Sequence, residues 1–254
     1  MTPTGPSVHD GERGPSRVRR RRRLHRHALE VLTSEIVAGQ RPPGDPLPSE
    51  QELAAHFDVS RGVARETIRG LEERGLISVR HGRGATVSPP ERWERFDPDV
   101  LEALLVSPRR TEVLGEYIEC RRIIEVEAAG LAAERATPDS VERLTAAYAR
   151  MEASAERAAG DPDGEELFHE ADLAFHEALI AGTGNQALAG LAGRLHRCLL
   201  AARYPLARPE NRAERALPEH RRILEAVAVG DPAAARGAMT AHLATVEGYL
   251  RERP

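Results

Sequence analysis

The sequence of 254 residues contains no lysine, because all 36 of its basic side chains are arginine. Together with abundant alanine, this preference is typical of a genome rich in G and C, and it identifies no function. It does exclude every chemistry that needs a lysine amine. The planar guanidinium of arginine can donate two parallel hydrogen bonds to a phosphate or a guanine, so each arginine remains a candidate for such contacts.

Cysteines and long apolar runs are also scarce. The two cysteines, Cys120 and Cys198, lie 78 positions apart in helical patterns, which excludes a disulfide framework or a CxxC metal knuckle and predicts buried thiols. No apolar run has the length of a membrane span, and no apolar segment follows the basic N-terminal stretch as it would in a signal peptide. The sequence therefore predicts a cytoplasmic protein without a membrane partner.

The net charge of −4 conceals an uneven distribution. Residues 1–90 carry 15 arginines against 11 acidic residues, a net charge of +4, whereas the rest carries 21 against 29, a net charge of −8. A basic N-terminal part followed by an acidic remainder predicts that the N-terminal part binds a polyanion.

The first 23 residues are expected to form a disordered basic tail, since proline, glycine and charged residues dominate its beginning. Five consecutive arginines, from Arg19 to Arg23, end this tail. Two interpretations stay equally open for them: a solvated segment, or an arm that adds contacts to nucleic acid phosphates.

Residues 24–88 have the pattern of a winged helix-turn-helix domain. A helix is expected over 24–38, ended by Gly39. Ser49 and Glu52 form a capping box that starts a second helix, and Ser60 caps a third that ends near residue 74. Two short strands, 76–79 and 85–87, then flank a glycine-rich tip and predict a small β-hairpin wing.

The remainder is expected to be helical throughout. Residues 89–96, with consecutive prolines, are predicted to be a linker. Residues 97–252 predict an all-α bundle, so the fold class is mainly α. Proline and glycine breakers divide the bundle into seven expected helices, at 97–106, 111–136, 138–159, 165–182, 186–203, 211–229 and 231–252.

The third helix carries the candidate DNA-reading residues. The first turns of such a helix face base edges, and here they contain Arg61, Gly62 and Arg65. Glycine costs a helix about 1 kcal/mol relative to alanine, so Gly62 fits a helix pressed against DNA better than one that is merely solvated. The tip, His81-Gly-Arg83-Gly, offers donors beside small residues, which suits a wing entering a minor groove. A solvated arginine face is the weaker alternative.

Four polar residues fall in the middle of apolar helix faces in the second domain. Asp172 and His176 are four positions apart and project together, while His220 and His242 are each central to the apolar face of a later helix. A buried carboxylate needs a partner, and one Asp with three neutral imidazoles could bind a divalent ion such as Zn, Ni or Mn. Each histidine alone would be read as a hydrogen-bonded core residue, and His169 and His196 are assigned that role.

Arg121 is likewise central to an apolar stripe, on the helix expected at 111–136. A buried guanidinium needs an anion. The internal candidate is Glu125, four residues on, and the external candidate is the carboxylate of a bound ligand, held in a fork. We favour the ligand.

The first domain resembles the GntR family of bacterial regulators. The resemblance rests on Leu-Pro-Ser-Glu at 47–50, Val-Ser-Arg at 59–61, Arg-Glu at 65–66, the stretch 71–76 and the Gly-Arg-Gly wing. It implies DNA contacts from Arg61, Gly62, Arg65, His81 and Gly82. Ser60 and Arg83, which adjoin Arg61 and Gly82 in the sequence, are also predicted DNA contacts. The family usually has arginine where this chain has Gln51, so that contact is expected to be weaker and uncharged.

The second domain resembles the FCD domain, which would place the chain in the FadR subfamily. The similar segments are 121–125 with 131–133, 172–176, Gly184-Asn185, His220 and His242. The resemblance implies that Asp172, His176, His220 and His242 hold the metal, and that Arg121 and Asn185 contact the effector. The stretch from Trp93 to Leu101 is similar to members of the family that sense sugar acids.

These features predict a homodimeric repressor, not an enzyme, that binds a palindromic double-stranded DNA operator. A small organic carboxylate at the metal would release it. Three alternatives stay open: activation in place of repression, a regulator of the same fold that senses an acyl ligand without metal, and a metal-dependent hydrolase that activates water.

Overall fold

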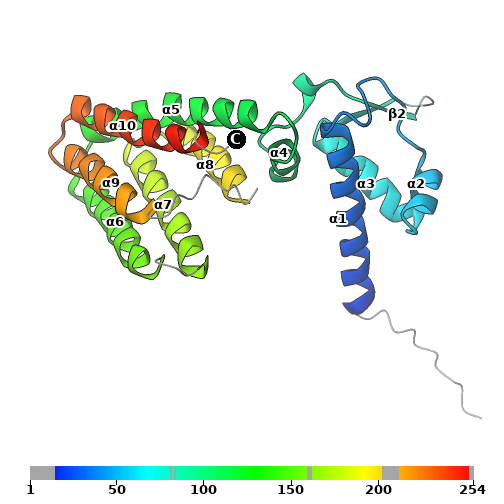
Figure 1. Ribbon diagram of the computed structural model, residues 1–254, viewed down its shortest axis with the longest axis horizontal. Helices are drawn as coiled ribbons and strands as arrows, with labels where there is room; N and C mark the ends of the chain where they lie inside the picture. Colours follow the sequence, from blue (N-terminus) through cyan, green and yellow to red (C-terminus); the bar gives the residue numbers. More distant parts are fainter. Residues whose placement is uncertain (1–14, 81, 83, 159–161, 202–211, 252–254) are drawn as a thin grey trace, which may run out of the picture. The chain divides into compact units, whose positions relative to one another are not determined.

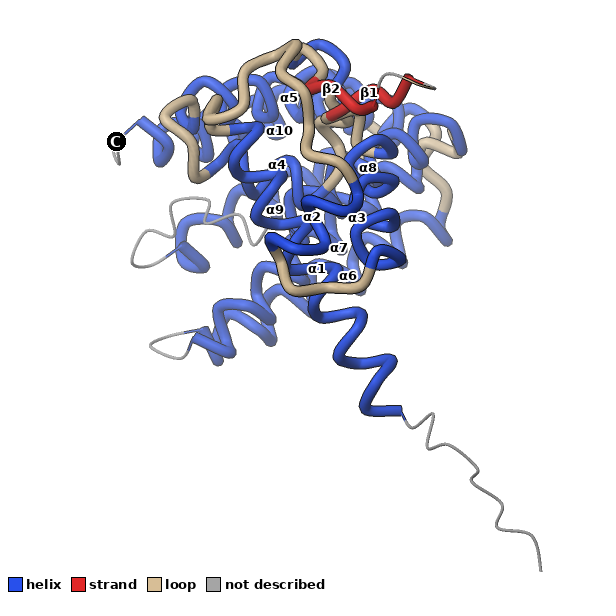
Figure 2. Tube along the Cα trace, turned by 90° about the vertical axis from the view of Figure 1, so that its right-hand side faces the viewer, coloured by secondary structure: helices blue, strands red, loops and turns tan. Residues whose placement is uncertain are grey.

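The computed structural model describes residues 15–80, 82, 84–158, 162–201 and 212–251. The chain divides into two compact units, Met1–Glu94 and Arg95–Pro254. Figure 2 shows that helix dominates and that, in the part of the chain described, the strands form one hairpin. The predicted class, mainly α with a small β-hairpin, is confirmed. Among the described residues, no helix is long and apolar enough to cross a membrane.

The first unit has the predicted order of three helices followed by a hairpin. The hairpin pairs antiparallel, with Ile77 opposite Val87 and Arg80 opposite Gly84. The elements are α1 (Pro15–Val37), α2 (Glu50–His56), α3 (Arg61–Glu73), β1 (Ile77–Arg80), β2 (Gly84–Val87) and the short 3-10 helix η1 (Pro90–Arg92). This is the arrangement of a winged helix-turn-helix.

Local capping explains where α2 and α3 begin. Ser49 Oγ accepts a hydrogen bond from the Glu52 amide, and the Glu52 carboxylate accepts one from the Ser49 amide at 2.8 Å. Ser60 Oγ accepts from the Val63 amide at 3.3 Å. Each cap satisfies amides that a helix N-terminus leaves without an intrahelical partner, so the predicted helix starts have a direct physical cause.

Gly75 ends α3 and lets the chain fold back closely. Its φ is +68°, and a Cβ at this position would lie 2.0 Å from the Arg92 carbonyl oxygen. Only glycine combines this left-handed conformation with such a close backbone approach. The turn positions the hairpin and Trp93, whose indole donates to the Ser88 carbonyl at 3.2 Å.

The N-terminal boundary of α1 differs from the expectation. The predicted disordered tail, residues 1–23, is wrong for its described part, because α1 begins at Pro15 and includes Arg19 to Arg23. Arginine is a good helix former, and extending an existing helix adds a hydrogen bond per residue without a new nucleation cost. The core-facing side of α1, with Leu32 and Ile36 buried, supplies that existing helix.

The second unit is the predicted all-α bundle, and within its described part all seven expected helices are present. They are α4 (Pro98–Leu105), α5 (Arg110–Glu134), α6 (Pro138–Ala158), α7 (Pro162–Gly182), α8 (Gln186–Ala201), α9 (Arg212–Ala228) and α10 (Pro232–Arg251). Helix α5 packs along α10, and α6 packs along α7 and α9 (Figure 1).

The interior of this bundle combines an apolar core with buried polar groups. Phe168, Phe175, Met151 and Met239 are among its buried apolar side chains. Among the described residues, the same interior holds eight buried arginine, acidic and histidine side chains: Arg121, Glu125, His169, Asp172, His176, His196, His220 and His242. Charged and imidazole groups are costly to bury without partners, so their mutual contacts define the candidate site.

Candidate metal centre and DNA-binding surface

Three helices bring the predicted ligand residues together. Asp172 and His176 come from α7, His220 from α9 and His242 from α10, and all four side chains are buried. One nitrogen from each of His176, His220 and His242 lies within 4.8 Å of the other two. The Asp172 carboxylate lies beside this trio, with Oδ1 3.1 Å from Nε2 of His220.

Hydrogen bonds orient two of the imidazoles. Nδ1 of His220 lies 2.8 Å from the Ala216 carbonyl oxygen, which can only accept, so Nδ1 is the donor. Nδ1 of His242 lies 2.9 Å from Oε2 of Glu219, and Thr245 donates to the other oxygen of that carboxylate at 2.7 Å. In the neutral tautomer fixed by these bonds, both Nε2 atoms carry lone pairs available to a metal.

Nε2 of His220 faces other electron-rich atoms. It lies 3.3 Å from Nε2 of His176 as well as 3.1 Å from the Asp172 oxygen. A neutral His220 whose proton is on Nδ1 can donate to neither atom, so a cation among them would relieve the repulsion. The three imidazole nitrogens form a donor set that suits Zn²⁺, Ni²⁺ or Mn²⁺, with the Asp172 carboxylate next to His220. The residues present therefore fit a divalent ion.

Burial favours the metal-binding, neutral form of two of the imidazoles, His176 and His242. Desolvation lowers the pKa of His176, against the opposing effect of the Glu125 carboxylate. Desolvation also lowers the pKa of His242, to about 3, and the nearby His220 adds to the effect. Neutral imidazole is the ligand form, so little proton release would oppose metal binding near neutral pH.

Arg121 is paired with Glu125, the internal candidate, in the structure. Its Nε and Nη2 atoms donate to the two oxygens of Glu125 at 2.7 and 3.2 Å, and both side chains are buried. Burial alone would raise the pKa of Glu125, but the Arg121 guanidinium, helped by hydrogen bonds from His176 and His196, outweighs it and holds that pKa well below its usual range. The pair is thus ionised. Arg121 Nη2 also lies 3.4 Å from Nε2 of His176. The guanidinium is therefore at the edge of the cluster formed by Asp172, His176, His220 and His242.

Sequence reasoning missed Glu219 and also missed the contacts that Glu125 and His196 make between helices. Glu219 orients His242, while Glu125 joins Arg121 to the cluster, with Oε2 2.8 Å from Nδ1 of His176. His196, assigned a structural role, has Nε2 2.9 Å from Oε1 of Glu125. No pattern along one helix identifies these contacts, because each joins residues on different helices.

The structure does not bring Asn185 to the cluster. Its side chain is exposed, and its Oδ1 accepts from the Leu188 amide at 3.1 Å, so it caps the start of α8. An effector contact from Asn185 stays a prediction.

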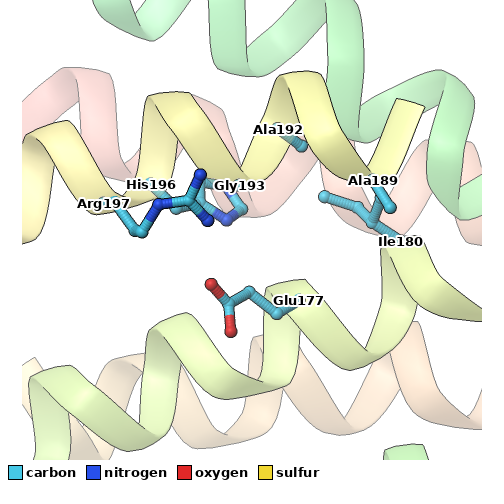
Figure 3. Close-up of a pocket in the computed structure, with 7 residues that line it drawn as sticks. All are labelled: Glu177, Ile180, Ala189, Ala192, Gly193, His196 and Arg197. Atoms are coloured by element: carbon cyan, nitrogen blue, oxygen red, sulfur yellow. The ribbon is translucent and has the colours of Figure 1, made fainter. Parts of the chain in front are cut away.

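A groove of about 240 Å³ lies beside the cluster, between α7 and α8. Figure 3 shows Glu177 on α7 facing His196 and Arg197 on α8, with Ile180 and small residues at the other end. His196 contributes to both places, since it borders the groove and contacts Glu125. The groove therefore lies one side chain away from the Arg121–Glu125 pair.

The predicted DNA-facing side of α3 is exposed. Arg61, Gly62 and Arg65 are all exposed there, as is Gln51 on α2. Arg65 donates two hydrogen bonds, of 2.9 and 3.0 Å, to the carboxylate of Glu50. At the hairpin tip, Gly82 has φ +73°, while the predicted contacts His81 and Arg83 lie outside the described residues. Ser60 is the cap of α3.

A winged helix-turn-helix joined to an all-helical domain with a buried ligand-type cluster defines a class, the DNA-binding regulators with a separate sensing domain. The sequence comparisons agree. Residues 24–87 match the family of bacterial regulatory proteins named gntR, and residues 116–245 match the FCD domain. The chain belongs to the gntR family and carries an FCD domain.

Relatives along nearly the whole chain support this assignment. The chain is 31% identical to the galactonate operon transcriptional repressor of Escherichia coli over 87% of its own length and 94% of that protein. It is 34% identical to the transcriptional regulator LutR of Bacillus subtilis, over 85% and 98%. A solved structure of Lar, which controls the Listeria monocytogenes agr system, shares the fold with a TM-score of 0.64 at 19% identity, covering 91% of this chain and 98% of Lar.

These matches make the chain a DNA-binding transcriptional regulator. The family and the relatives are regulators and not enzymes, so the hydrolase alternative is set aside.

Proposed function

We propose that the chain is a homodimeric repressor that a small organic carboxylate releases from a palindromic operator. The carboxylate would bind at a divalent metal ion held by Asp172, His176, His220 and His242. The observation that carries the metal proposal is the surroundings of His220: its Nδ1 is committed to a carbonyl, and its Nε2 faces Asp172 and His176. An ion at this point would supply positive charge to the ligand carboxylate.

Arg121 is the second proposed contact for the ligand. Its guanidinium reaches the cluster edge at His176 and is already oriented by Glu125. An incoming carboxylate would share this guanidinium with Glu125, so the buried pair would have to adjust when the ligand binds. That adjustment would link the ligand to the helices α5, α7 and α8, which carry Arg121, His176 and His196.

The effector class is supported by one relative. The galactonate operon repressor is named for a sugar acid, and it aligns with most of this chain. A sugar acid has a carboxylate for the metal and hydroxyl groups for the surrounding polar side chains. We therefore propose sugar acids as the first compounds to test.

On the DNA side, exposed residues of the first unit supply the proposed contacts. Arg61 and Arg65 would read base edges, Gly62 would allow close approach, and Ser60 and Gln51 would contact the phosphate backbone. His81, Gly82 and Arg83 would enter the minor groove with the wing. A twofold-symmetric dimer would place two such domains on two half-sites.

The metal proposal is tested by metal content. The wild-type chain, purified without added metal or chelator, should carry about one divalent ion per chain by mass spectrometry. A His220→Ala/His242→Ala variant should carry none. His56→Ala, which removes an exposed histidine of α2, is the matched control and should keep the ion. Absence of metal from the wild type would favour the alternative in which the same fold senses an acyl ligand without metal.

The proposed release of DNA on ligand binding is tested separately, through the thermodynamic linkage of the two binding equilibria. If a sugar acid lowers operator affinity, operator DNA must lower the affinity for that acid by the same factor. Titrating the acid by calorimetry with and without operator duplex measures this directly. An acid that binds equally well in both cases would refute the release mechanism for that compound.

A further inference from the structure

The N-terminal part of α1 lies outside the segment that the gntR family accounts for. The family match begins at residue 24, whereas α1 begins at Pro15. The intervening turns contain five consecutive arginines, from Arg19 to Arg23, and all five are exposed. This basic segment is therefore a feature of this chain that the family assignment leaves unexplained.

Helices α1 and α3 pack with their N-terminal ends on the same side. Three contacts follow each other in the same direction along both helices. Arg21 Nη2 lies 3.7 Å from where a Cβ on Gly62 would be, His25 Nδ1 lies 3.3 Å from Thr67 Oγ1, and Leu29 Cδ1 lies 3.2 Å from where a Cβ on Gly70 would be. The start of α3, which in a helix-turn-helix points into the major groove, is thus level with Arg21.

The remaining residues of α1 project further. Pro15 lies six positions before Arg21, which corresponds to about 9 Å of helix at 1.5 Å per residue. Figure 1 shows α1 running past the ends of α2 and α3. Along the axis of α1, the arginines at 19–23 therefore lie on both sides of the point at which α3 begins. All five side chains are exposed to solvent.

The spacing of packed helices places this segment at the wall of the groove. Packed helix axes lie about 8–10 Å apart, and the major groove of B-DNA is about 12 Å wide. With α3 in the groove, a parallel neighbour at that distance meets the phosphates that border it. A run of arginines without apolar residues suits phosphate and lacks the apolar face that a membrane-binding helix needs.

We propose that α1 is a helical phosphate clamp, in which Arg21 contacts the DNA backbone beside the groove that α3 enters. Gly62 contributes by leaving open the space next to the Arg21 guanidinium. The clamp rests on the proposed placement of α3 on DNA. It adds affinity for any duplex and no preference for one sequence, because phosphates are the same at every base pair.

The test compares two arginines of one helix. Arg21 is on the face of α1 that meets α3, while Arg23 is two residues on, about 200° around the helix and facing away. Full-length Arg21→Gln and Arg23→Gln variants change the net charge equally. Binding to an operator duplex selected with the wild-type chain, and to a scrambled duplex, is measured by fluorescence anisotropy between 50 and 200 mM salt.

The clamp predicts that Arg21→Gln weakens binding to both duplexes by the same factor. The slope of log affinity against log salt should become less steep by about 0.9, the value of one lost phosphate contact. The deficit relative to wild type should therefore shrink about threefold between 50 and 200 mM salt. Arg23→Gln should change the slope by less than half as much, and Arg21→Lys should restore it, since a lysine keeps the point charge.

Equal effects of Arg21→Gln and Arg23→Gln, or no effect of Arg21→Gln, would overturn the clamp. A loss confined to the operator duplex would also overturn it, because it would indicate base reading. Arg65→Gln separates the two proposals: it should lower the preference for operator over scrambled duplex. If Arg65→Gln does so while Arg21→Gln is silent, the placement of α3 stands and only the clamp fails.

Discussion

Glu219 holds the ring of His242 by accepting a hydrogen bond from its Nδ1 atom at 2.9 Å, and Thr245 in turn holds Glu219. The carboxylate is only partly buried, yet it determines which nitrogen of a buried imidazole faces the cluster. Carboxylates in this position raise the basicity of a metal-bound histidine and fix its orientation.

Replacing Glu219 should therefore weaken metal binding without removing a ligand. We expect Glu219→Ala to lower metal affinity about 10- to 100-fold, the usual effect of losing such a partner. Glu219→Gln keeps an acceptor oxygen and should lose less. Competition with a chelator of known affinity measures both. Glu225→Ala, which removes an exposed glutamate six positions further along the same helix, is the control. Equal losses from Glu219→Ala and Glu225→Ala would argue against an orienting role.

The buried pair of Arg121 and Glu125 should be costly to break. Removing one partner leaves an uncompensated charge in the bundle, so Arg121→Ala or Glu125→Ala should each lower the free energy of unfolding by about 3–5 kcal/mol. Because both changes remove the same contact, the double variant should lose less than the sum of the two. Urea unfolding of the metal-free chain measures this. Additive losses would indicate that the two side chains are stabilised independently.

Gly62 offers a way to separate stability from DNA binding. A Cβ at this position would meet only Arg21 at 3.7 Å and Ser60 Oγ at 3.9 Å, both ordinary contact distances. Gly62→Ala should thus raise the free energy of unfolding, by up to about 1 kcal/mol, because alanine favours helix. The same methyl group should weaken operator binding if α3 is pressed against DNA.

Thermal unfolding and anisotropy on one Gly62→Ala preparation measure the two effects together. A variant that is more stable and binds operator as tightly as wild type would show that the DNA does not approach this residue closely.

Much of the fold was predictable because its signals are local. Ser49 with Glu52, and Ser60, mark helix starts within four residues, and the seven bundle helices are separated by prolines and glycines. The cluster histidines were predictable in part, since each is central to the apolar face of its own helix. What links them was not predictable: His196 and Glu125 are 71 residues apart, and the contact of α1 with α3 through His25 and Thr67 joins residues 42 positions apart.

Two glycines with left-handed backbones separate two costs of replacing a turn glycine by alanine. One is the cost of the backbone conformation, and the other is the steric clash of the added Cβ. Gly39 has φ +75° with open space around it, whereas Gly75 has φ +68° and faces the Arg92 carbonyl at a distance that no Cβ can occupy. Gly39→Ala should lose only the conformational cost, about 1–2 kcal/mol. Gly75→Ala should lose that amount and more, since the chain around Arg92 must shift. Chemical unfolding of both variants measures the difference, and equal losses would show that the segment at Arg92 yields at no cost.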